Sequence, residues 1–329
     1  MAIEFAADRA VRWGILATGH IAESFATDLA LTEGNELAAV GSRSSDSASA
    51  FADRHGAARS YGSYSELAAD PEVDVIYVAT PHSRHLDDVM TCFEAGKAVL
   101  CEKALTMNAT DTRALVDEAR RRELFFAEAM WMRTNPNIRR AVELAADGLL
   151  GDLGQVRAEL GFVAPPDKAR LWDPALGAGA LLDIGIYPLT FAHLVLGEPI
   201  SIVAAGVRSD RGIDVNGGAT LTYASGAVAS IAWTQVAHSD NRASIAGDRG
   251  RIEIPARFHH PTEINHTHDD HTDTIREPVV GRGYAHEIAE VAACLRAGTT
   301  ESALLPLDDT VAIMEQIDEI LRQIGIAER

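Results

Sequence analysis

An apolar segment that runs into a glycine turn and then into a helix is the feature that most constrains the fold of this chain. Residues 12–16 are followed by Ala17-Thr18-Gly19-His20-Ile21-Ala22. Such a turn lets backbone N–H groups approach a pyrophosphate at the positive end of a helix. The fingerprint G-x-G-x-x-G would place glycines at 17, 19 and 22, and only Gly19 is kept, with alanine at 22 an accepted variant. By itself, the segment fits a dinucleotide site and a plain strand–turn–helix equally well.

Composition narrows the classes of protein to consider. With 329 residues, of which 47% are hydrophobic and 23% charged, the chain is expected to form two globular domains. A net charge of −19 disfavours binding to nucleic acid. The three cysteines form no C-x-x-C pair, and neither an export signal nor a membrane-spanning apolar run is visible. We therefore expect a cytoplasmic protein with no nucleic-acid or membrane partner.

Strand and helix patterns alternate over the first 130 residues. The strand-like segments are continuous apolar runs, as expected for strands buried on both faces. They are residues 12–18, 36–43, 73–80, 98–103 and 125–130. The repeated β-α-β order predicts a doubly wound parallel sheet of the Rossmann type, whose ligands bind at the carboxyl ends of the strands.

The pattern changes after residue 130. Alternating apolar and polar residues between 200 and 254, with a turn at Ser225-Gly226, indicate an antiparallel sheet, and two helical segments close the chain. We therefore predict a Rossmann domain over residues 1–130. An α+β domain with a large, mostly antiparallel open sheet should follow over residues 131–329.

The second strand of the predicted Rossmann sheet ends in Ser42-Arg43. NAD-binding sites usually have an acidic residue here for the ribose 2′-hydroxyl, whereas an arginine suits a 2′-phosphate. The residues therefore favour NADP, with NAD possible. A surface arginine at a strand end is the alternative.

Two later strands also end in polar residues. Thr80-Pro81 and His85 follow the third strand, where helix capping explains them as well as contact with a cofactor does. Glu102-Lys103 follows the fourth strand, and a lysine there can hold a substrate oxygen or lower the pKa of a neighbouring acid. An exposed ion pair is the alternative.

These motifs together resemble the glucose–fructose oxidoreductase / inositol dehydrogenase (Gfo/Idh/MocA) family. The matching elements occur in order: the turn at 14–22, Thr80-Pro81…His85, Glu102-Lys103, residues 128–133, residues 179–187 and Gly283-Tyr284. Within the family, these sequence motifs are most similar to those of the branch of dimeric dihydrodiol dehydrogenases and D-xylose dehydrogenases. The resemblance implies an NADP-dependent dehydrogenase for a sugar, polyol or trans-dihydrodiol. It also implies a homodimer, or a dimer of dimers, formed through the open sheet.

The resemblance assigns roles to individual residues. The cofactor would contact Thr18, Gly19, His20, Ile21, Ser42, Arg43, Thr80, Pro81, His85, Glu102 and Lys103. Lys103, Asp183 and Tyr187 would be catalytic, and Arg133, Arg170 and Trp172 would contact the substrate. Trp172 lies in a Pro/Gly-rich loop that could cover the site or pack at the domain junction.

Asp183 and Tyr187 are four residues apart, so on a helix they share one face. Tyr187 would take the substrate hydroxyl proton during hydride transfer to NADP. A tyrosine with a pKa of about 10 is a poor base at neutral pH, and a nearby Lys103 would favour its phenolate. Asp183 would orient the hydroxyl or the lysine. A buried tyrosine with one hydrogen bond and a helix-capping aspartate are the alternatives.

The chain departs from the family pattern at two positions. The family usually has proline, often after a cis bond, where this chain has Ala104. A cis bond before a residue other than proline costs about 2.5–4 kcal/mol, so we expect a trans Lys103–Ala104 bond and a shifted lysine turn. Ala17 in place of glycine would crowd the pyrophosphate.

A histidine-rich stretch follows residue 258. It contains His259, His260, His266, His268 and His271 together with Asp269, Asp270 and Asp273. These are metal-ligand types, and alternation places His266 and His268 on one face of a strand. Because the spacing matches no common zinc pattern, we interpret the stretch as a solvated edge strand and loop and expect no metal.

Two other functions fit the same fold. One is NAD-linked glycosidase or isomerase chemistry in which the nicotinamide is retained. The other is a non-catalytic NADP-sensing regulator, against which the presence of Lys103, Asp183 and Tyr187 argues, because a sensor needs none of them.

Overall fold

The computed structural model describes residues 9–326, which form two compact units. Unit 1 runs to Thr134 and also includes Val280–Val311, whereas unit 2 comprises Asn135–Val279 and the chain from Ala312 onward. The predicted division at residue 130 had placed 280–311 in the second domain. That segment joins unit 1 because Asp28 of unit 1 accepts hydrogen bonds from the backbone N–H groups of Arg282 and Tyr284.

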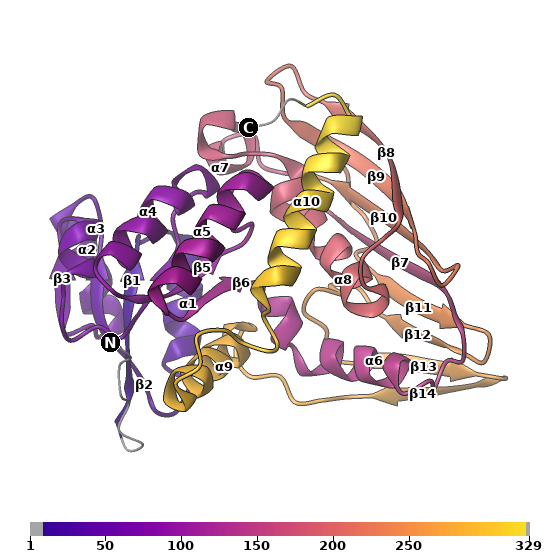
Figure 1. Cartoon of the computed structure of the whole chain (residues 1–329), viewed down its shortest axis with the longest axis horizontal. Coiled ribbons are helices and arrows are strands. Elements are labelled where there is room, and N and C mark those ends of the chain that lie inside the picture. Colours follow the sequence, from indigo (N-terminus) through magenta and orange to yellow (C-terminus); the bar gives the residue numbers. More distant parts are fainter. Residues whose placement is uncertain (1–8, 327–329) are drawn as a thin grey trace. The chain divides into compact units, whose positions relative to one another are not determined.

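Unit 1, in which β1, β2, β3, β5 and β6 are labelled in Figure 1, is built around a parallel sheet of six strands. Their order is β3-β2-β1-β4-β5-β6. Its elements are β1 (Val11–Leu16), α1 (His20–Leu29), β2 (Asn35–Gly41), α2 (Ser45–His55), β3 (Arg59–Tyr61), α3 (Tyr64–Ala68), β4 (Val75–Val78), α4 (His82–Glu94), β5 (Ala98–Glu102), α5 (Ala109–Arg122), β6 (Phe126–Ala129), η1 (Trp131–Thr134) and α9 (Tyr284–Ala297). The predicted doubly wound sheet is confirmed. The short strand β3 was not predicted.

The strands of this sheet are apolar because both of their faces are covered. All residues of β4, β5 and β6 are buried. Side chains of Ser44, Ser63 and Asn108 cap the N-termini of α2, α3 and α5, and these caps fix where the helices begin. The helix starts, and the loops before them, therefore lie at the carboxyl edge of the sheet.

Unit 2 contains an eight-stranded sheet in the order β14-β13-β12-β11-β7-β10-β9-β8. Its elements are α6 (Pro136–Ala146), β7 (Leu153–Gly161), α7 (Ala169–Trp172), η2 (Pro174–Leu176), η3 (Leu181–Gly185), α8 (Ile186–Leu196), β8 (Ser201–Arg208), β9 (Asp214–Thr222), β10 (Val228–Thr234), β11 (Ala243–Gly247), β12 (Arg251–Ile254), β13 (Ile264–His268) and β14 (His271–Ile275). Helix α10 (Leu307–Gln323) begins in unit 1 and continues into unit 2. All neighbouring strands are antiparallel except β7 and β10. The predicted mostly antiparallel sheet is thus confirmed.

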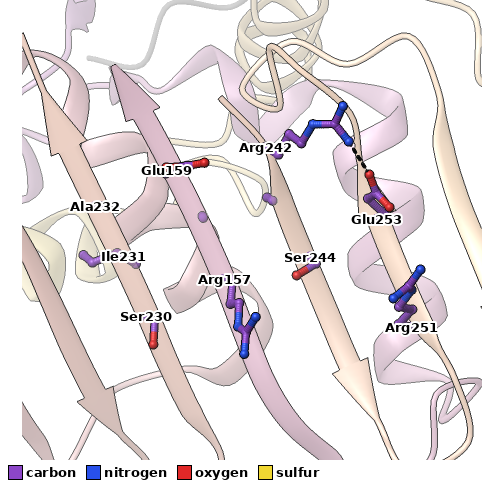
Figure 2. A pocket seen from close by; sticks show the side chains of 11 residues that line it. Arg157, Glu159, Ser230, Ile231, Ala232, Arg242, Ser244, Arg251 and Glu253 are labelled. Carbon is purple, nitrogen blue, oxygen red and sulfur yellow. Dashed lines mark hydrogen bonds and ion pairs between the residues drawn. The ribbon is translucent and has the colours of Figure 1, made fainter. Parts of the chain in front are cut away.

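The strand register gives the two faces of this sheet different chemistry. On the inner face, one row across the strands consists of Ile202, Leu221, Ala229, Val156, Ile245 and Ile252. The neighbouring row on the outer face consists of Val203, Thr220, Ser230, Arg157, Ser244 and Glu253. The inner row is apolar and packs into the core of unit 2, whereas the outer row is mainly polar (Figure 2).

Among residues 9–326, one helical segment, Pro174–Leu196, is long and apolar enough to cross a membrane, with a mean hydropathy of 1.5. However, 78% of its most apolar window is buried inside the fold. This is the behaviour of a helix in the core of a folded domain.

Candidate active site

The loops after β1 and β4 lie side by side at the carboxyl edge of the parallel sheet. The two strands pair directly, and the Ala79 N–H donates to the Leu16 carbonyl at 3.0 Å. On the other side of β1, the Ala17 N–H donates to the Gly41 carbonyl at 2.9 Å. Strand order reverses at β1, and this is the point where doubly wound sheets bind nucleotides.

The N-terminus of α1 is open at this edge. Gly19 is its N-cap and is exposed, no side chain caps the helix, and a Cβ built on Gly19 would meet nothing within 4 Å. Thr18 and Ile21 are partly exposed, and His20 is exposed. The unpaired first-turn N–H groups and the helix dipole suit an anion. The arrangement therefore fits a pyrophosphate.

Ala17 has a φ of +90°. This is a conformation that glycine adopts freely and alanine does not. The backbone thus keeps the form of the glycine fingerprint although the residue has changed.

Ser42 and Arg43 follow β2 at the same edge. The Ser42 N–H donates to the Tyr61 carbonyl at 3.1 Å, and its buried hydroxyl accepts a weak bond from the Ser44 N–H at 3.4 Å. Arg43 is exposed, and within residues 9–326 no carboxylate forms an ion pair with it. Its charge is thus available to a phosphate.

Thr80 and His85 lie deeper in unit 1. The buried Thr80 hydroxyl has no hydrogen-bond partner among the described residues. His85 is fully buried, with Nε2 2.8 Å from the Thr80 carbonyl and Nδ1 3.0 and 3.1 Å from the carbonyls of Ala104 and Leu105. Burial lowers the pKa of His85, and the carbonyl contacts oppose this. The Nδ1 contacts join His85 to residues 104 and 105 of the turn formed by residues 103–105, called the lysine turn below. Pro81 is the N-cap of α4, the helix that contains His85.

The Lys103–Ala104 peptide bond is cis, so the prediction of a trans bond was wrong. Groups that are distant in sequence surround this turn. His82 Nε2 lies 3.1 Å from the Lys103 carbonyl, and the Leu105 N–H donates to Glu128 Oε1 at 2.9 Å. The trans bond was predicted from the intrinsic free-energy cost of a cis bond alone, without these contacts.

Two side chains that the sequence analysis did not assign support the same turn. The buried Tyr77 hydroxyl donates to Glu102 Oε1, and Glu102 Oε2 accepts from the Lys103 N–H at 3.2 Å. Burial, followed by Glu102, raises the pKa of Tyr77 well above its usual value. Burial also raises the pKa of Glu128 to about 7. A tyrosine and a glutamate inside otherwise apolar strands were the signal that each has a specific partner.

Asp183 and Tyr187 lie in one continuous helical segment of unit 2. Asp183 belongs to η3, a π-helical turn, and Tyr187 is in the first turn of α8. Such turns often occur at functional sites. Both residues are buried, and Asp183 Oδ1 accepts from Arg170 Nη1 at 2.7 Å. The Tyr187 ring lies 5.1 Å from the ring of His259, a neighbour that the sequence analysis did not identify.

A buried carboxylate fixes the start of η3. Asp214 Oδ2 accepts from the Leu181 N–H at 2.6 Å and from the Trp233 indole N–H at 3.0 Å. A Cβ on Gly185 would lie 2.8 Å from Leu181 and 2.9 Å from Trp233. Close packing and a buried acceptor thus set the position of the segment that carries Asp183.

Two of the predicted substrate residues make contacts within their own units. The guanidinium of Arg133 is buried and donates to the Leu304 carbonyl at 2.9 Å and to Asp309. The half-buried Trp172 donates from its indole nitrogen to the Pro165 carbonyl at 2.9 Å. Their roles in substrate binding stay predictions.

The predicted site residues therefore fall into two groups. Unit 1 contains Arg133 and every predicted cofactor residue, including Lys103, and most of these residues lie at one sheet edge. Unit 2 contains Asp183, Tyr187, Arg170 and Trp172.

Comparison with known proteins agrees with this arrangement. Residues 11–129 match the model of the oxidoreductase family with an NAD-binding Rossmann fold, and residues 138–253 match the GFO/IDH/MocA C-terminal domain. The chain is 37% identical to trans-1,2-dihydrobenzene-1,2-diol dehydrogenase of Bos taurus and 36% identical to that of Homo sapiens. In both cases 96% of this chain and 98% of the relative are covered.

Solved structures show the same fold. A 3-ketoreductase from Actinomadura kijaniata, in complex with NADP and TDP-benzene, superposes with a TM-score of 0.87 at 26% identity, covering 96% of this chain and 98% of that one. An aldose-aldose oxidoreductase from Caulobacter crescentus reaches a TM-score of 0.88 at 24% identity, covering 96% and 97%. The identity to these dehydrogenases exceeds one third over nearly the whole chain, and two family models match. The carboxyl edge of the unit 1 sheet agrees with the same family assignment. The chain belongs to the Gfo/Idh/MocA family of oxidoreductases.

Proposed function

We propose that this protein is an NADP-dependent dehydrogenase that oxidises a secondary alcohol of a sugar, polyol or trans-dihydrodiol. The observation that carries the proposal is the carboxyl edge of the unit 1 sheet. At that edge, β1 is followed by an open helix N-terminus and β2 by the exposed Arg43. Strand β5 ends there in Glu102, which Lys103 follows. NADP⁺, when bound there, accepts a hydride from the substrate carbon.

The residues of unit 1 suit each part of this cofactor. Backbone N–H groups from Thr18 to Ile21 would bind the pyrophosphate, and Arg43 with Ser42 would bind the 2′-phosphate. Thr80 offers a buried hydroxyl that lacks a protein partner among the described residues. These donors fit an anionic dinucleotide better than a neutral ligand.

Arg43 provides the test of cofactor preference. In Arg43→Gln, we expect the KM for NADP⁺ to rise at least about tenfold, because a charged hydrogen-bonding pair is lost, while the KM for NAD⁺ stays within about twofold. Arg121→Gln is the matched control, since Arg121 is an exposed arginine on α5 that pairs with Glu118. Equal changes for both cofactors would refute the assignment of Arg43 to the 2′-phosphate.

The protein's own groups would handle the proton. Tyr187 takes the proton of the substrate hydroxyl, Lys103 favours the phenolate, and Asp183, held by Arg170, orients the hydroxyl. This route requires Lys103 of unit 1 and Tyr187 of unit 2 to reach the same hydroxyl.

Replacing the tyrosine tests this route. In Tyr187→Phe, kcat should fall about 10²–10⁴-fold, while NADPH binding, followed by fluorescence, is unchanged. Tyr223→Phe is the control, because the buried Tyr223 hydroxyl has no hydrogen-bond partner among the described residues. Undiminished turnover of Tyr187→Phe would exclude this proton route.

A substrate panel separates the dehydrogenase from the alternatives. Sugars, inositols and trans-dihydrodiols are assayed by NADPH absorbance with both NADP⁺ and NAD⁺. Net NADPH formation supports the proposal. Retained cofactor with product formation but no net NADPH would instead indicate glycosidase or isomerase chemistry.

We also infer a homodimer that forms through the outer face of the unit 2 sheet. This face carries charged residues of β7 and β12, together with Arg242 directly before β11 (Figure 2). Val203 and Val207 of β8 are also exposed. Arg157 lies centrally in it, beside Ser230 and Ser244. Arg157→Glu should shift the protein toward the monomer in sedimentation equilibrium. A wild-type monomer at micromolar concentration would contradict the inference.

A further inference from the structure

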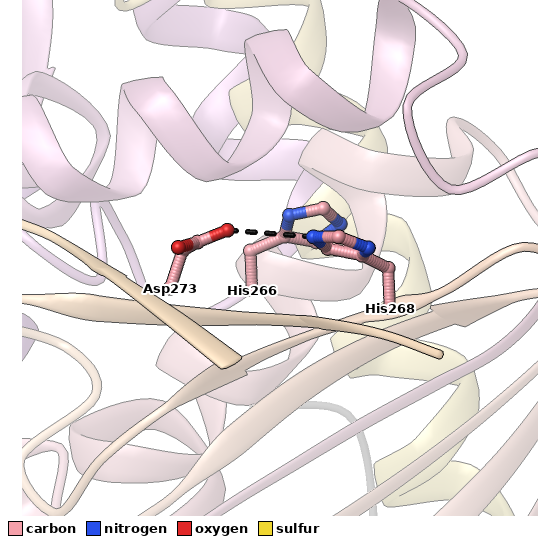
Figure 3. A group of neighbouring side chains, drawn as sticks. All are labelled: His266, His268 and Asp273. Carbon is pink, nitrogen blue, oxygen red and sulfur yellow. Dashed lines mark hydrogen bonds and ion pairs between the residues drawn. The ribbon is translucent and has the colours of Figure 1, made fainter. Parts of the chain in front are cut away.

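The edge of the large sheet carries histidines that the proposed dehydrogenase chemistry does not use. Strands β13 and β14 pair antiparallel, with His266 opposite Asp273 and His268 opposite His271. Directly opposite residues, and residues two apart on a strand, share one face of a sheet. These four side chains therefore stand on the same side of the hairpin, and Figure 3 shows three of them close together.

The cluster lies at the end of the apolar row on the inner face. Ile245 lies opposite Ile252, which lies opposite His266, and both isoleucines are fully buried. His266 itself is only 7% exposed. The buried His266 ring thus continues a core row, whereas Asp273 beyond it is exposed, and burying a polar ring is costly unless it binds a partner.

One ligand atom from each of His266, His268 and Asp273 lies within 4.8 Å of the others. The rings of His266 and His268 stack with centroids 4.9 Å apart, and His268 Nε2 lies 3.4 Å from Asp273 Oδ2. Zinc bonds of about 2.0–2.2 Å place tetrahedral ligand atoms roughly 3.3 Å apart. Small side-chain rotations therefore suffice to bring all three atoms onto one ion.

His266 supplies an independent sign of a missing ligand. Its Nε2 is buried and has no hydrogen-bond partner within the described part of the chain. Gly250 lies beside this nitrogen, and a Cβ there would come within 3.3 Å of it.

We propose that the β13–β14 hairpin binds one divalent transition-metal ion of the zinc type through His266, His268 and Asp273. Two imidazoles and a carboxylate are a donor set that zinc accepts, with a fourth position left for water or for His271. His271 Nε2 lies 2.9 Å from the other oxygen of Asp273. The ion would join the edge strand β14 to β13, so its role would be structural.

Zinc binding by the full chain tests the proposal. Untagged, chelator-treated protein is titrated with ZnCl₂ by calorimetry, next to the Asp273→Asn and Asp270→Asn variants. Both variants remove one negative charge from the same hairpin, but Asp270 is an exposed turn residue outside the cluster. We expect one zinc per chain with micromolar or tighter affinity, about tenfold or more weaker in Asp273→Asn and within about twofold in Asp270→Asn.

A second variant and a spectroscopic measurement complete the test. His268→Gln should weaken binding as Asp273→Asn does, and Co²⁺ in place of zinc should give visible absorption that both ligand variants lose. Tryptophan fluorescence without metal checks that each variant is folded. If only one of Asp273→Asn and His268→Gln is folded, its zinc affinity alone tests the proposal. Binding only at millimolar zinc, or equal weakening by Asp270→Asn, would overturn the proposal and leave an ordinary cluster of surface side chains.

Discussion

The dependence of stability on pH tests how unit 1 holds its lysine turn. Glu128 is buried in β6, where Oε1 accepts from the Leu105 N–H at 2.9 Å and Oε2 accepts from the Thr310 hydroxyl at 3.2 Å. Burial raises its pKa from 4.5 to about 7, and these two hydrogen bonds act in the opposite direction. Glu128→Gln keeps the shape and an acceptor for Leu105, can donate to Thr310, and does not titrate.

The sign and size of the effect follow from the raised pKa. The folded state holds this proton more tightly than the unfolded state, so the contribution to stability is complete below pH 4.5 and is lost as the pH rises through 7. At about 1.36 kcal/mol per unit of pKa, the rise from 4.5 to about 7 corresponds to about 3 kcal/mol. Glu128→Gln lacks this loss. Its stability relative to wild type should therefore increase by about 3 kcal/mol between pH 4.5 and pH 8.

Urea unfolding followed by tryptophan fluorescence measures the effect at several pH values between 4.5 and 8. Glu118→Gln is the control in the same unit. Glu118 is exposed on α5, and Arg121 and then Arg122 lower its pKa to about 2, so it stays ionised over this range. Because an unfolded glutamate titrates near pH 4.5, its variant should give a profile parallel to wild type between about pH 5.5 and 8.

Parallel profiles for Glu128→Gln and wild type would refute the reasoning, because they would show that Glu128 titrates alike in the folded and unfolded chain. A constant stability loss added to the expected rise with pH would not refute the reasoning. It would show that glutamine fails to replace the hydrogen bonds to Leu105 and Thr310, while the titration of Glu128 still has its expected effect on stability.

Two further predictions concern backbone geometry and packing. Ala17→Gly should stabilise the protein by about 1 kcal/mol, because glycine relieves the positive φ at the cost of some chain entropy; unchanged or lower stability in urea unfolding would contradict this. Gly185→Ala should destabilise it by about 1–3 kcal/mol, because the new methyl group would overlap Leu181 and Trp233. Gly154→Ala, where a Cβ meets nothing within 4 Å, is the packing control and should differ by much less in thermal unfolding.

The sequence predicted the unit 1 sheet well because its strands are buried on both faces and therefore form continuous apolar runs. It did not predict β3, whose three residues Arg59–Tyr61 are half-buried or exposed and give no such run. The cis bond at Lys103–Ala104 was also beyond prediction, since its surroundings depend on His82, His85 and Glu128. Contacts from distant positions leave no mark in the local sequence.

The histidine-rich stretch shows the same limit. Its spacing predicts one solvated edge strand and loop, but the structure divides the stretch. His259 packs against Tyr187, whereas His266 and His268 meet Asp273 across a hairpin. Alternation along one strand predicted that His266 and His268 share a face, but which residue lies opposite them depends on cross-strand register.

Buried polar groups in each unit support the proposed catalytic side chains. In unit 1, Glu128 and His85 bind the backbone next to Lys103, and in unit 2, Asp214 binds the start of the turn that carries Asp183. Such groups are costly unless every partner is in place, and satisfied networks rigidify the segments they bind. Apolar side chains would have stabilised these positions with less desolvation. The hydrogen bonds that Glu128, His85 and Asp214 make to the backbone beside Lys103 and Asp183 therefore fix the segments that carry those two residues.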